Sequence, residues 1–136
     1  DFRLATPGSR FGVPIARTLG NCLSASNVRR LVDTLGVSLV KRMLLLAEMP
    51  TAENLPTGYL TVVAPEALDA HLADLTSRLA ANAPITLQVT KEILRRLAVN
   101  PEPADADLIR RTYGSADFHE GVDAFVSKRA PRWQGK

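Results

Sequence analysis

SADFHEGVDAFVSKRAPRWQGK, residues 115–136, joins a helix-start signal, an amphipathic helix and a basic tail in one stretch of this 136-residue chain. Asp117 and Glu120 stand three residues apart, so we expect the first carboxylate to cap free backbone N–H groups and the second to close a capping box. An apolar stripe at helical spacing follows, which predicts a helix docked on a core and ended by Pro131. The residues of the stripe, which ends beside Lys128, are Phe118, Val122, Phe125, Val126 and Arg129.

This C-terminal stretch closely resembles the end of the enoyl-CoA hydratase/isomerase family, the crotonase superfamily, whose members finish in the pattern S-x-D-x-x-E-G-x-x-A-F-x-x-K-R-x-P-x-W/F. Residues 9–20, SRFGVPIARTLG, are similar to the strand and turn that carry F-G-x-P-E in relatives. Residues 1–48 and 59–136 follow the family pattern, which implies about the C-terminal half of a usual member. The matching C-terminal residues are Ser115, Asp117, Glu120, Gly121, Ala124, Phe125, Lys128, Arg129, Pro131 and Trp133.

Bulk composition excludes several classes of protein. The chain is long enough for one domain, or part of one, and it has no apolar run of about 18 residues that would cross a bilayer. It shows no secretory leader and has a single cysteine, Cys22, so a cytoplasmic, reducing environment fits best. It opens on Asp1 in DFRLA, which is typical of the inside of a strand, so we expect a fragment or a cleaved product.

Basic residues outnumber acidic ones, giving a net charge of +3, and many of them form pairs such as Lys128-Arg129. The pairs hint at anionic partners, but each lies in a predicted helix with an apolar stripe, so solvated outer faces account for most of them. Aromatic residues make up only 5% of the chain, too few to act with the basic pairs as a stacking platform. The composition therefore argues against nucleic-acid binding.

The predicted elements are mostly helical. Apolar or β-branched runs predict strands at residues 1–5 and 59–64, and five or six helices with so little strand suit the helical half of a larger α/β domain. With the resemblance, this predicts the C-terminal, mostly helical part of the crotonase (ClpP/crotonase-like) spiral fold. Residues 1–64 would end the core, and residues 65–136 would form a helical trimerisation region. The helices ahead of the terminal one are expected from Ser26 to Gly36, from Ser38 to before Pro50, from Pro65, from Pro84 and from Asp105 to Tyr113, with Ser26, Ser38 and Asp105 as caps.

Helical spacing also predicts apolar faces on two of these helices and an ion pair on one of them. Glu92 is placed to pair with Arg95 or Arg96. The faces are Leu39, Met43 and Leu46 on the helix from Ser38, and Val89, Ile93 and Leu97 on the helix from Pro84.

Few residues carry chemistry of their own. His71 and His119 have no carboxylate or thiol at metal-ligand spacing, so we expect both on the surface and no metal site. Cys22 has no partner histidine nearby, and we expect it to be buried as a small apolar residue. No glycine-rich loop that could cradle a phosphate is present.

The resemblance implies chemistry on an enoyl-CoA thioester. In such hydratases two glutamates orient and deprotonate the water that adds across the double bond, while two backbone N–H groups hold the developing enolate oxygen. The second glutamate position, directly after Pro14, holds Ile15 here, which cannot transfer a proton. The other glutamate and both N–H groups belong to the N-terminal half of the family, outside this chain. Two further departures are Ser24-Ala-Ser26 in place of Gly-Gly, and Pro56, which should shorten its helix.

Binding residues are likewise implied by the resemblance. Phe125 and Lys128 would bind coenzyme A, with Lys128 reaching its phosphates, although a cation at this position also suits the helix macrodipole. The residues of the acyl pocket would also fit an ordinary core. These acyl-pocket residues are Phe11, Pro14, Ile15 and Leu19.

The expected function is the hydration of a trans-2-enoyl-CoA in fatty-acid metabolism, once an N-terminal half completes the site. A one-carboxylate enoyl-CoA isomerase, an acyl-CoA hydrolase variant and a non-catalytic fragment or assembly subunit remain open. The implied partners are an acyl-CoA or enoyl-CoA substrate, an N-terminal companion segment and further copies in a trimer or hexamer. Coenzyme A enters as part of the substrate, and no separate cofactor, metal, nucleic acid or membrane is expected.

Overall fold

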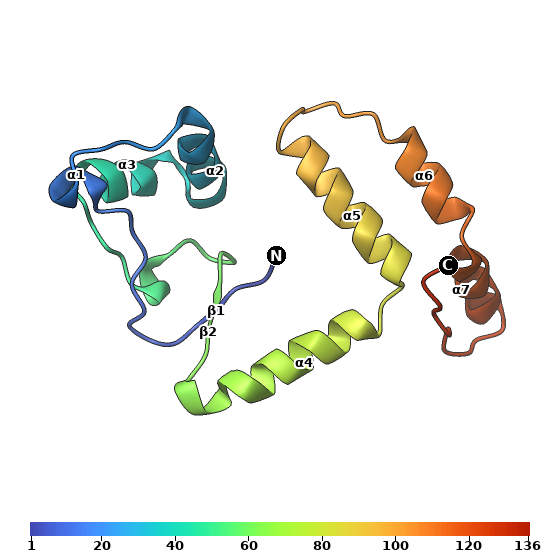
Figure 1. The fold of residues 1–136 in the computed structure, drawn as a ribbon. Coiled ribbons are helices and arrows are strands. Elements are labelled where there is room, and N and C mark those ends of the chain that lie inside the picture. Colours follow the sequence, from blue (N-terminus) through green and yellow to red (C-terminus); the bar gives the residue numbers. More distant parts are fainter. The chain divides into compact units, whose positions relative to one another are not determined.

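The computed structural model describes residues 1–136, which form two compact units, Asp1–Leu72 and Ala73–Lys136. The boundary falls inside α4 (Leu68–Ala80), and the 3-10 turn Pro65–Ala67 leads into that helix as Pro65 predicts. The two units are described separately below (Figure 1). None of the helices combines the length and apolar composition that a membrane span requires.

The first unit contains a two-stranded parallel sheet. β1 (Leu4–Ala5) pairs with β2 (Thr61–Val62), so that Leu4 lies opposite Thr61 and Ala5 opposite Val62. Of the strands predicted over residues 1–5 and 59–64, only two residues each form, Leu4–Ala5 and Thr61–Val62. Both residues of β2 are exposed, whereas Ala5 of β1 is buried.

Three helices follow β1: α1 (Ile15–Thr18), α2 (Ala25–Leu35) and α3 (Val37–Leu45). The cap of α2 is Ser24, whose Oγ accepts a hydrogen bond from the Asn27 backbone N–H at 3.3 Å, so the predicted cap at Ser26 is wrong. The cap of α3 is Gly36 rather than Ser38. Gly36 ends α2 and starts α3 with a φ of 80°, a conformation that glycine adopts without steric cost.

The core of the first unit lies between α2 and α3. Pro56 shortens the next helix as predicted, because residues Ala52–Asn54 form only a 3-10 turn. The predicted apolar face of α3 is only partly buried, since Leu46 beyond its end is exposed. The buried centre is formed by Leu35, Val40 and Met43, and Leu31, Val32, Leu39, Leu44, Leu55 and Tyr59 pack around it.

The second unit is entirely helical beyond α4. It contains α5 (Pro84–Leu97), α6 (Ala106–Tyr113) and α7 (Ala116–Val126). Its buried centre is formed by Ile85, Val89 and Leu108, with Ile93 packed against it. The predicted stripe of α5 is therefore confirmed through Ile93, while Leu97 at the helix end is exposed. The buried core is small in both units. In the second unit, hydrogen bonds and ion pairs at the surface therefore also hold the helices together.

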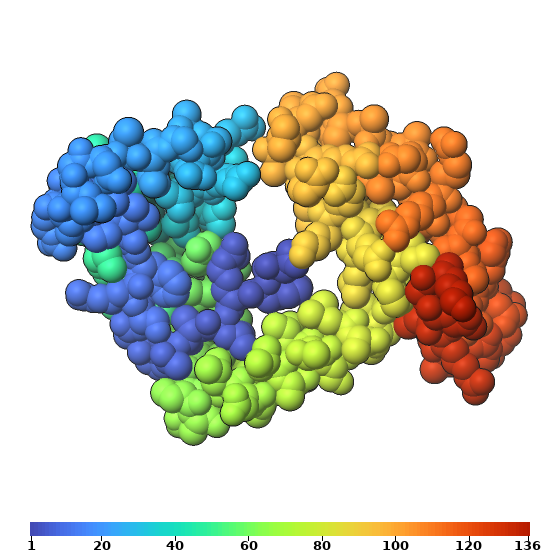
Figure 2. Space-filling model, in the orientation of Figure 1, coloured from blue at the N-terminus to red at the C-terminus, as the bar shows by residue number.

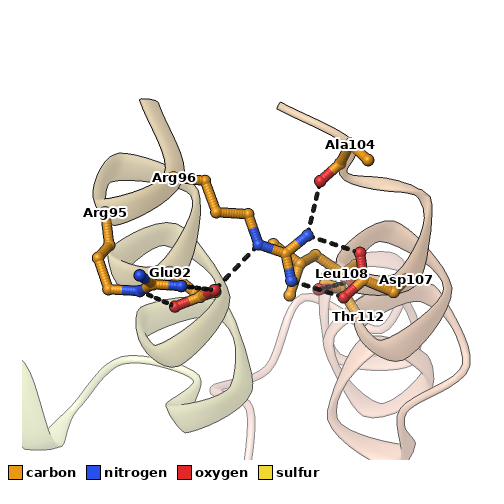
Figure 3. Close-up of polar contacts among 7 residues, drawn as sticks. All are labelled: Glu92, Arg95, Arg96, Ala104, Asp107, Leu108 and Thr112. Atoms are coloured by element: carbon orange, nitrogen blue, oxygen red, sulfur yellow. Dashed lines mark hydrogen bonds and ion pairs between the residues drawn. The ribbon is translucent and has the colours of Figure 1, made fainter. Parts of the chain in front are cut away.

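One arginine joins α5 to the start of α6 (Figure 3). The Arg96 guanidinium donates to Glu92 at 2.9 Å, to both carboxylate oxygens of Asp107 at 2.8 and 2.7 Å, and to the Ala104 carbonyl at 2.6 Å. Arg95 also donates to Glu92, at 2.7 and 2.8 Å, so both predicted partners of this glutamate are confirmed. Hydrogen bonds from Arg95 and Arg96 lower the pKa of Glu92 to about 2, and those from Arg96 lower the pKa of Asp107 to about 2.

We expect Arg96→Ala to lower the free energy of unfolding at neutral pH. The Glu92 pKa is depressed from 4.5 to about 2, so its contribution is present above about pH 4.5 and is lost as the pH falls towards 2. The difference between wild type and variant should therefore shrink over this window in urea unfolding followed by circular dichroism. Arg110→Ala, an exposed arginine of α6 without an ion pair, is the control. A difference that does not change with pH would contradict the role of these carboxylates.

Candidate functional site

Phe11, predicted for the acyl pocket, is set in place by a neighbouring segment. Its backbone N–H donates to the Pro50 carbonyl at 2.9 Å, and the preceding residue, Arg10, forms an antiparallel bridge with Thr51. The half-buried ring meets the Tyr59 ring edge-on, with ring centroids 6.4 Å apart and an interplanar angle of 90°. Tyr59 is thus a neighbour of the candidate site that the sequence did not suggest, because the two residues are far apart in the chain.

The other predicted acyl-pocket residues lie on and beside α1. Pro14 caps this short helix, and its carbonyl accepts hydrogen bonds from the backbone N–H groups of Arg17 and Thr18, both at 3.1 Å. Pro14 and Ile15 are half-buried, whereas Leu19 is 73% exposed. The structure therefore keeps Phe11, Pro14 and Ile15 in one partly covered stretch and leaves Leu19 open to solvent. Their role in binding an acyl chain stays a prediction.

We expect Gly12→Ala to destabilise the first unit by about 1–3 kcal/mol. A Cβ at this position would lie 2.5 Å from the Met49 Sδ and 2.9 Å from the Glu48 carbonyl oxygen, and the latter is backbone that cannot rotate away. Chemical unfolding of this variant is compared with that of Ala16→Ser, at an exposed position of α1. Equal stability of the two variants would show that the segments carrying Gly12 and Met49 do not approach closely.

The start of α7 differs from the predicted capping box. Ser115 is the cap: its Oγ accepts a hydrogen bond from the Phe118 backbone N–H at 3.0 Å and donates one to the Thr112 carbonyl at 2.7 Å. The prediction that Asp117 caps the helix and Glu120 closes the box is wrong, because Ser115 already fills this role. Asp105, at the start of α6, likewise stands in the predicted cap position but makes no side-chain cap bond.

Asp117 instead binds the C-terminal tail, residues 129–136. Its carboxylate is only 2% exposed and accepts hydrogen bonds from the backbone N–H groups of Gln134 at 2.7 Å and Gly135 at 2.9 Å. The Asp117 backbone N–H donates to the Lys136 carbonyl at 3.1 Å. The first turn of α7 and the end of the chain therefore satisfy each other's polar groups.

Glu120 binds the beginning of the same tail. Its two oxygens accept hydrogen bonds from the Arg129 guanidinium at 2.7 and 2.8 Å, and one of them also accepts the Arg132 backbone N–H at 2.7 Å. Arg129 contacts Asp123 as well, at 2.5 Å. These bonds, above all that from Arg129, lower the pKa of Glu120 to about 2. We call the contacts of Asp117 and Glu120 with residues 129–136 the tail latch.

An aromatic contact extends the tail latch to the start of α5. The Trp133 Nε1 donates to the Ala81 carbonyl at 2.9 Å, and the ring lies against Gly121 of α7. In Figure 2 the tail, in dark red, lies on the second unit beside the yellow-green residues between α4 and α5. The tail is thus held to the body of this unit at both of its ends.

The apolar stripe of α7 faces solvent beyond Phe118, which is half-buried and whose ring contacts that of Tyr113. Phe125 is 85% exposed and Val126 is 74% exposed, while Ala124 is buried. The prediction that this stripe docks on the core of the chain is therefore wrong: the buried face of α7 carries Asp117 and Ala124. Within the second unit nothing covers Phe125, so the side chain is available to a ligand or to another protein surface.

Lys128 follows α7 in an unusual backbone conformation. Its φ is 50°, and the helix ends as in a Schellman motif, with the Lys128 N–H donating to the Phe125 carbonyl at 3.2 Å and the Arg129 N–H to the Ala124 carbonyl at 3.0 Å. Glycine usually fills this position, and a left-handed residue with a side chain costs on the order of 1 kcal/mol. No ion pair or hydrogen bond engages the Lys128 ammonium within the chain. A free cation and an exposed aromatic ring thus stand three residues apart at the end of α7.

Other residues with chemical potential lie elsewhere. Cys22 is exposed, so the prediction of a buried thiol is wrong, whereas His71 and His119 are exposed as predicted. No three His, Cys, Asp or Glu side chains cluster as a metal site would require. Two open hollows, of about 470 and 500 Å³, lie at the start of α3 and beside Glu120 and Arg129–Arg132. None of the six residues predicted to bind substrate lines either hollow.

A sequence model of the family "Enoyl-CoA hydratase/isomerase" matches residues 1–136. The chain belongs to this family. It is 33% identical over 142 residues to the 2,3-dehydroadipyl-CoA hydratase of Escherichia coli K12, in an alignment that covers all of the chain and 55% of that protein. A carnitinyl-CoA dehydratase of Citrobacter koseri is 30% identical over 146 residues, with 100% of the chain and 56% of the relative covered.

Solved structures of the family share the fold. The crystal structure of an enoyl-CoA hydratase subunit I from Geobacillus kaustophilus superimposes with a TM-score of 0.84 at 28% identity, covering 100% of the chain and 55% of that structure. The chain is therefore the mostly helical, C-terminal part of a crotonase fold, as the resemblance implied. It spans about half the length of the curated enoyl-CoA hydratase/isomerase relatives that it matches.

We expect Lys128→Gly to stabilise the second unit by up to about 1 kcal/mol, because glycine removes the cost of the left-handed conformation. Lys128→Ala, which removes the same ammonium but keeps a Cβ, is the matched control and should bring no such gain. Urea unfolding followed by circular dichroism measures both. Equal stability of the two variants would contradict backbone strain at this position.

Proposed function

We propose that the protein acts on acyl-CoA or enoyl-CoA thioesters and hydrates a trans-2-enoyl-CoA. The observation that carries this proposal is the family match over the whole chain, together with relatives named as a CoA hydratase and a CoA dehydratase. These names share one chemistry, the addition or removal of water next to a coenzyme A thioester.

The chain's share of the acyl site is apolar. We propose that the half-buried Phe11, Pro14 and Ile15 contact the acyl chain, with Leu19 at the exposed edge of the same segment. Ile15 supplies no proton-transfer group, so this segment contributes shape and exclusion of water rather than acid–base chemistry. The acyl site therefore depends on a carboxylate from another part of the protein.

Two glutamates of the first unit, Glu48 and Glu53, already have an ion-pair or hydrogen-bond partner. Glu48 forms an ion pair with Arg42 at 2.7 Å, and Glu53 accepts the Gly8 backbone N–H at 2.7 Å. The hydrogen bond with Thr51, and to a smaller extent the Gly8 contact, lower the pKa of Glu53 and favour its ionised form. Neither side chain is therefore a free general base, which supports an N-terminal companion region as the source of the catalytic carboxylate and of the oxyanion-binding N–H groups.

The coenzyme A end of the substrate is assigned to the end of α7. The exposed Phe125 ring offers a flat apolar surface for the adenine, and the uncompensated Lys128 ammonium offers a point charge for a phosphate. Lys128 lies beyond the last residue of α7, where a cation also meets the negative end of the helix dipole.

Exposed apolar side chains support completion by further protein surface. Leu45 and Leu46 in the first unit and Phe125 and Val126 in the second are each more than half exposed, beside cores of only a few residues. Apolar surface of this kind marks contact sites in soluble proteins. We propose that it is covered by the companion region and by further copies in a trimer or hexamer.

The test is a steady-state assay with crotonyl-CoA, using the protein expressed from its complete reading frame. We expect turnover, and we expect Lys128→Ala to raise the KM by about tenfold with kcat little changed, because a charge-assisted hydrogen bond to phosphate contributes about 1.5 kcal/mol. Lys41→Ala, at an exposed lysine of α3, is the control. Binding without turnover would favour the non-catalytic assembly subunit, and neither binding nor turnover would refute the proposal.

A further inference from the structure

Three polar contacts bind the last residues of the chain to the first turn of α7. The two oxygens of the Asp117 carboxylate each accept one backbone N–H, from Gln134 and Gly135, and the Asp117 N–H donates to the Lys136 carbonyl. Asp117 is only 2% exposed, so its carboxylate oxygens need hydrogen-bond donors from the protein in place of water. Asp117 therefore fixes the position of residues 134–136.

A second set of contacts binds the segment just after Lys128. Glu120 holds the Arg129 guanidinium in a bidentate pair and also accepts the Arg132 N–H, and Asp123 contacts Arg129 from the next turn of α7. Lys128 thus stands between the last turn of α7 and an arginine that three hydrogen bonds and ion pairs hold against the same helix. Its backbone has little freedom on either side.

This arrangement explains how a lysine remains in a glycine conformation. A left-handed residue with a side chain persists only where the surrounding structure fixes it, and here the strained residue is the one with an uncompensated ammonium. The tail latch also gives the two basic residues of the Lys128-Arg129 pair different surroundings. Arg129 is neutralised by two carboxylates, whereas Lys128 has none.

We propose that Asp117 and Glu120 are positioning residues that hold the tail so that the Lys128 ammonium is presented to a phosphate group of the coenzyme A thioester. The proposal rests on the proposed function, since it requires that Lys128 meets coenzyme A. It adds that the two carboxylates act through the tail and do not touch the substrate. Release of the latch should weaken recognition of the nucleotide end of the substrate and leave the thioester chemistry unchanged.

Two substrates separate positioning from general stability. Crotonyl-CoA carries the nucleotide phosphates, whereas crotonyl-pantetheine has the same reacting group without them. In the protein expressed from its complete reading frame, we expect Glu120→Gln and Asp117→Asn to raise the KM for crotonyl-CoA roughly tenfold, with kcat and the KM for crotonyl-pantetheine unchanged. Glu102→Gln, in the exposed loop before α6, is the control with no effect on either substrate.

A larger side chain at position 121 can disturb the tail without changing Asp117 or Glu120. A Cβ on Gly121 would lie 3.2 Å from the Trp133 ring, so Gly121→Ala should displace this ring by a few tenths of an ångström and loosen the tail while both carboxylates remain. Hydrogen–deuterium exchange of residues 129–136 should be faster in Gly121→Ala, Glu120→Gln and Asp117→Asn than in wild type. Glu120 is 24% exposed, so its substitution tests the latch even if loss of the buried Asp117 unfolds α7.

The outcomes distinguish the two proposals. A higher KM for crotonyl-CoA alone, with faster exchange of the tail, supports the positioning role. Faster exchange with an unchanged KM overturns it, as does a KM that rises equally for both thioesters. If Lys128→Ala itself has no effect on crotonyl-CoA, the coenzyme A assignment has failed, and the positioning role fails with it even where exchange shows that the tail is held.

Discussion

The buried carboxylate of Asp117 imposes the main constraint on the second unit. The polar oxygens of a residue that is 2% exposed must find hydrogen-bond donors inside the protein, and the backbone N–H groups of Gln134 and Gly135 supply them. The tail has to fold back over α7 to deliver these donors. The turn at Lys128, the contact of Trp133 with Gly121 and the exposure of Phe125 all accompany that path.

The same arrangement of an arginine between two carboxylates occurs twice in the second unit. Arg96 joins Glu92 to Asp107, and Arg129 joins Glu120 to Asp123, so each guanidinium links two carboxylates. Planar guanidinium groups suit such paired contacts better than an ammonium does. The consequence is that the net positive charge of the chain is carried by other residues, among them Lys128, which is free to meet an anion.

The first unit contributes an apolar segment with no carboxylate of its own at the position after Pro14. Ile15 follows Pro14 in a short helix, and the carboxylates of Glu48 and Glu53 are bound to Arg42 and Gly8. Family membership and the shorter length of the chain relative to its relatives support the proposal that this chain contributes apolar contacts to a thioester site and that the proton transfers belong to groups supplied from elsewhere in the protein.

The sequence alone predicted contacts between residues that lie close together in the chain. It did not predict contacts between residues that lie far apart in the chain. Helical spacing placed Glu92 against Arg95 and Arg96, and Pro56 ended a helix, because such relations lie within one or two turns. Asp117 and Glu120 looked like a capping box, yet their partners are 9 to 18 residues away and depend on the return of the tail. The apolar stripe of α7 was equally clear from the sequence. Helical periodicity, however, shows which residues share a face and does not show what covers that face. Only the folded chain showed that this face stays open, because its own tail packs on the opposite, polar side.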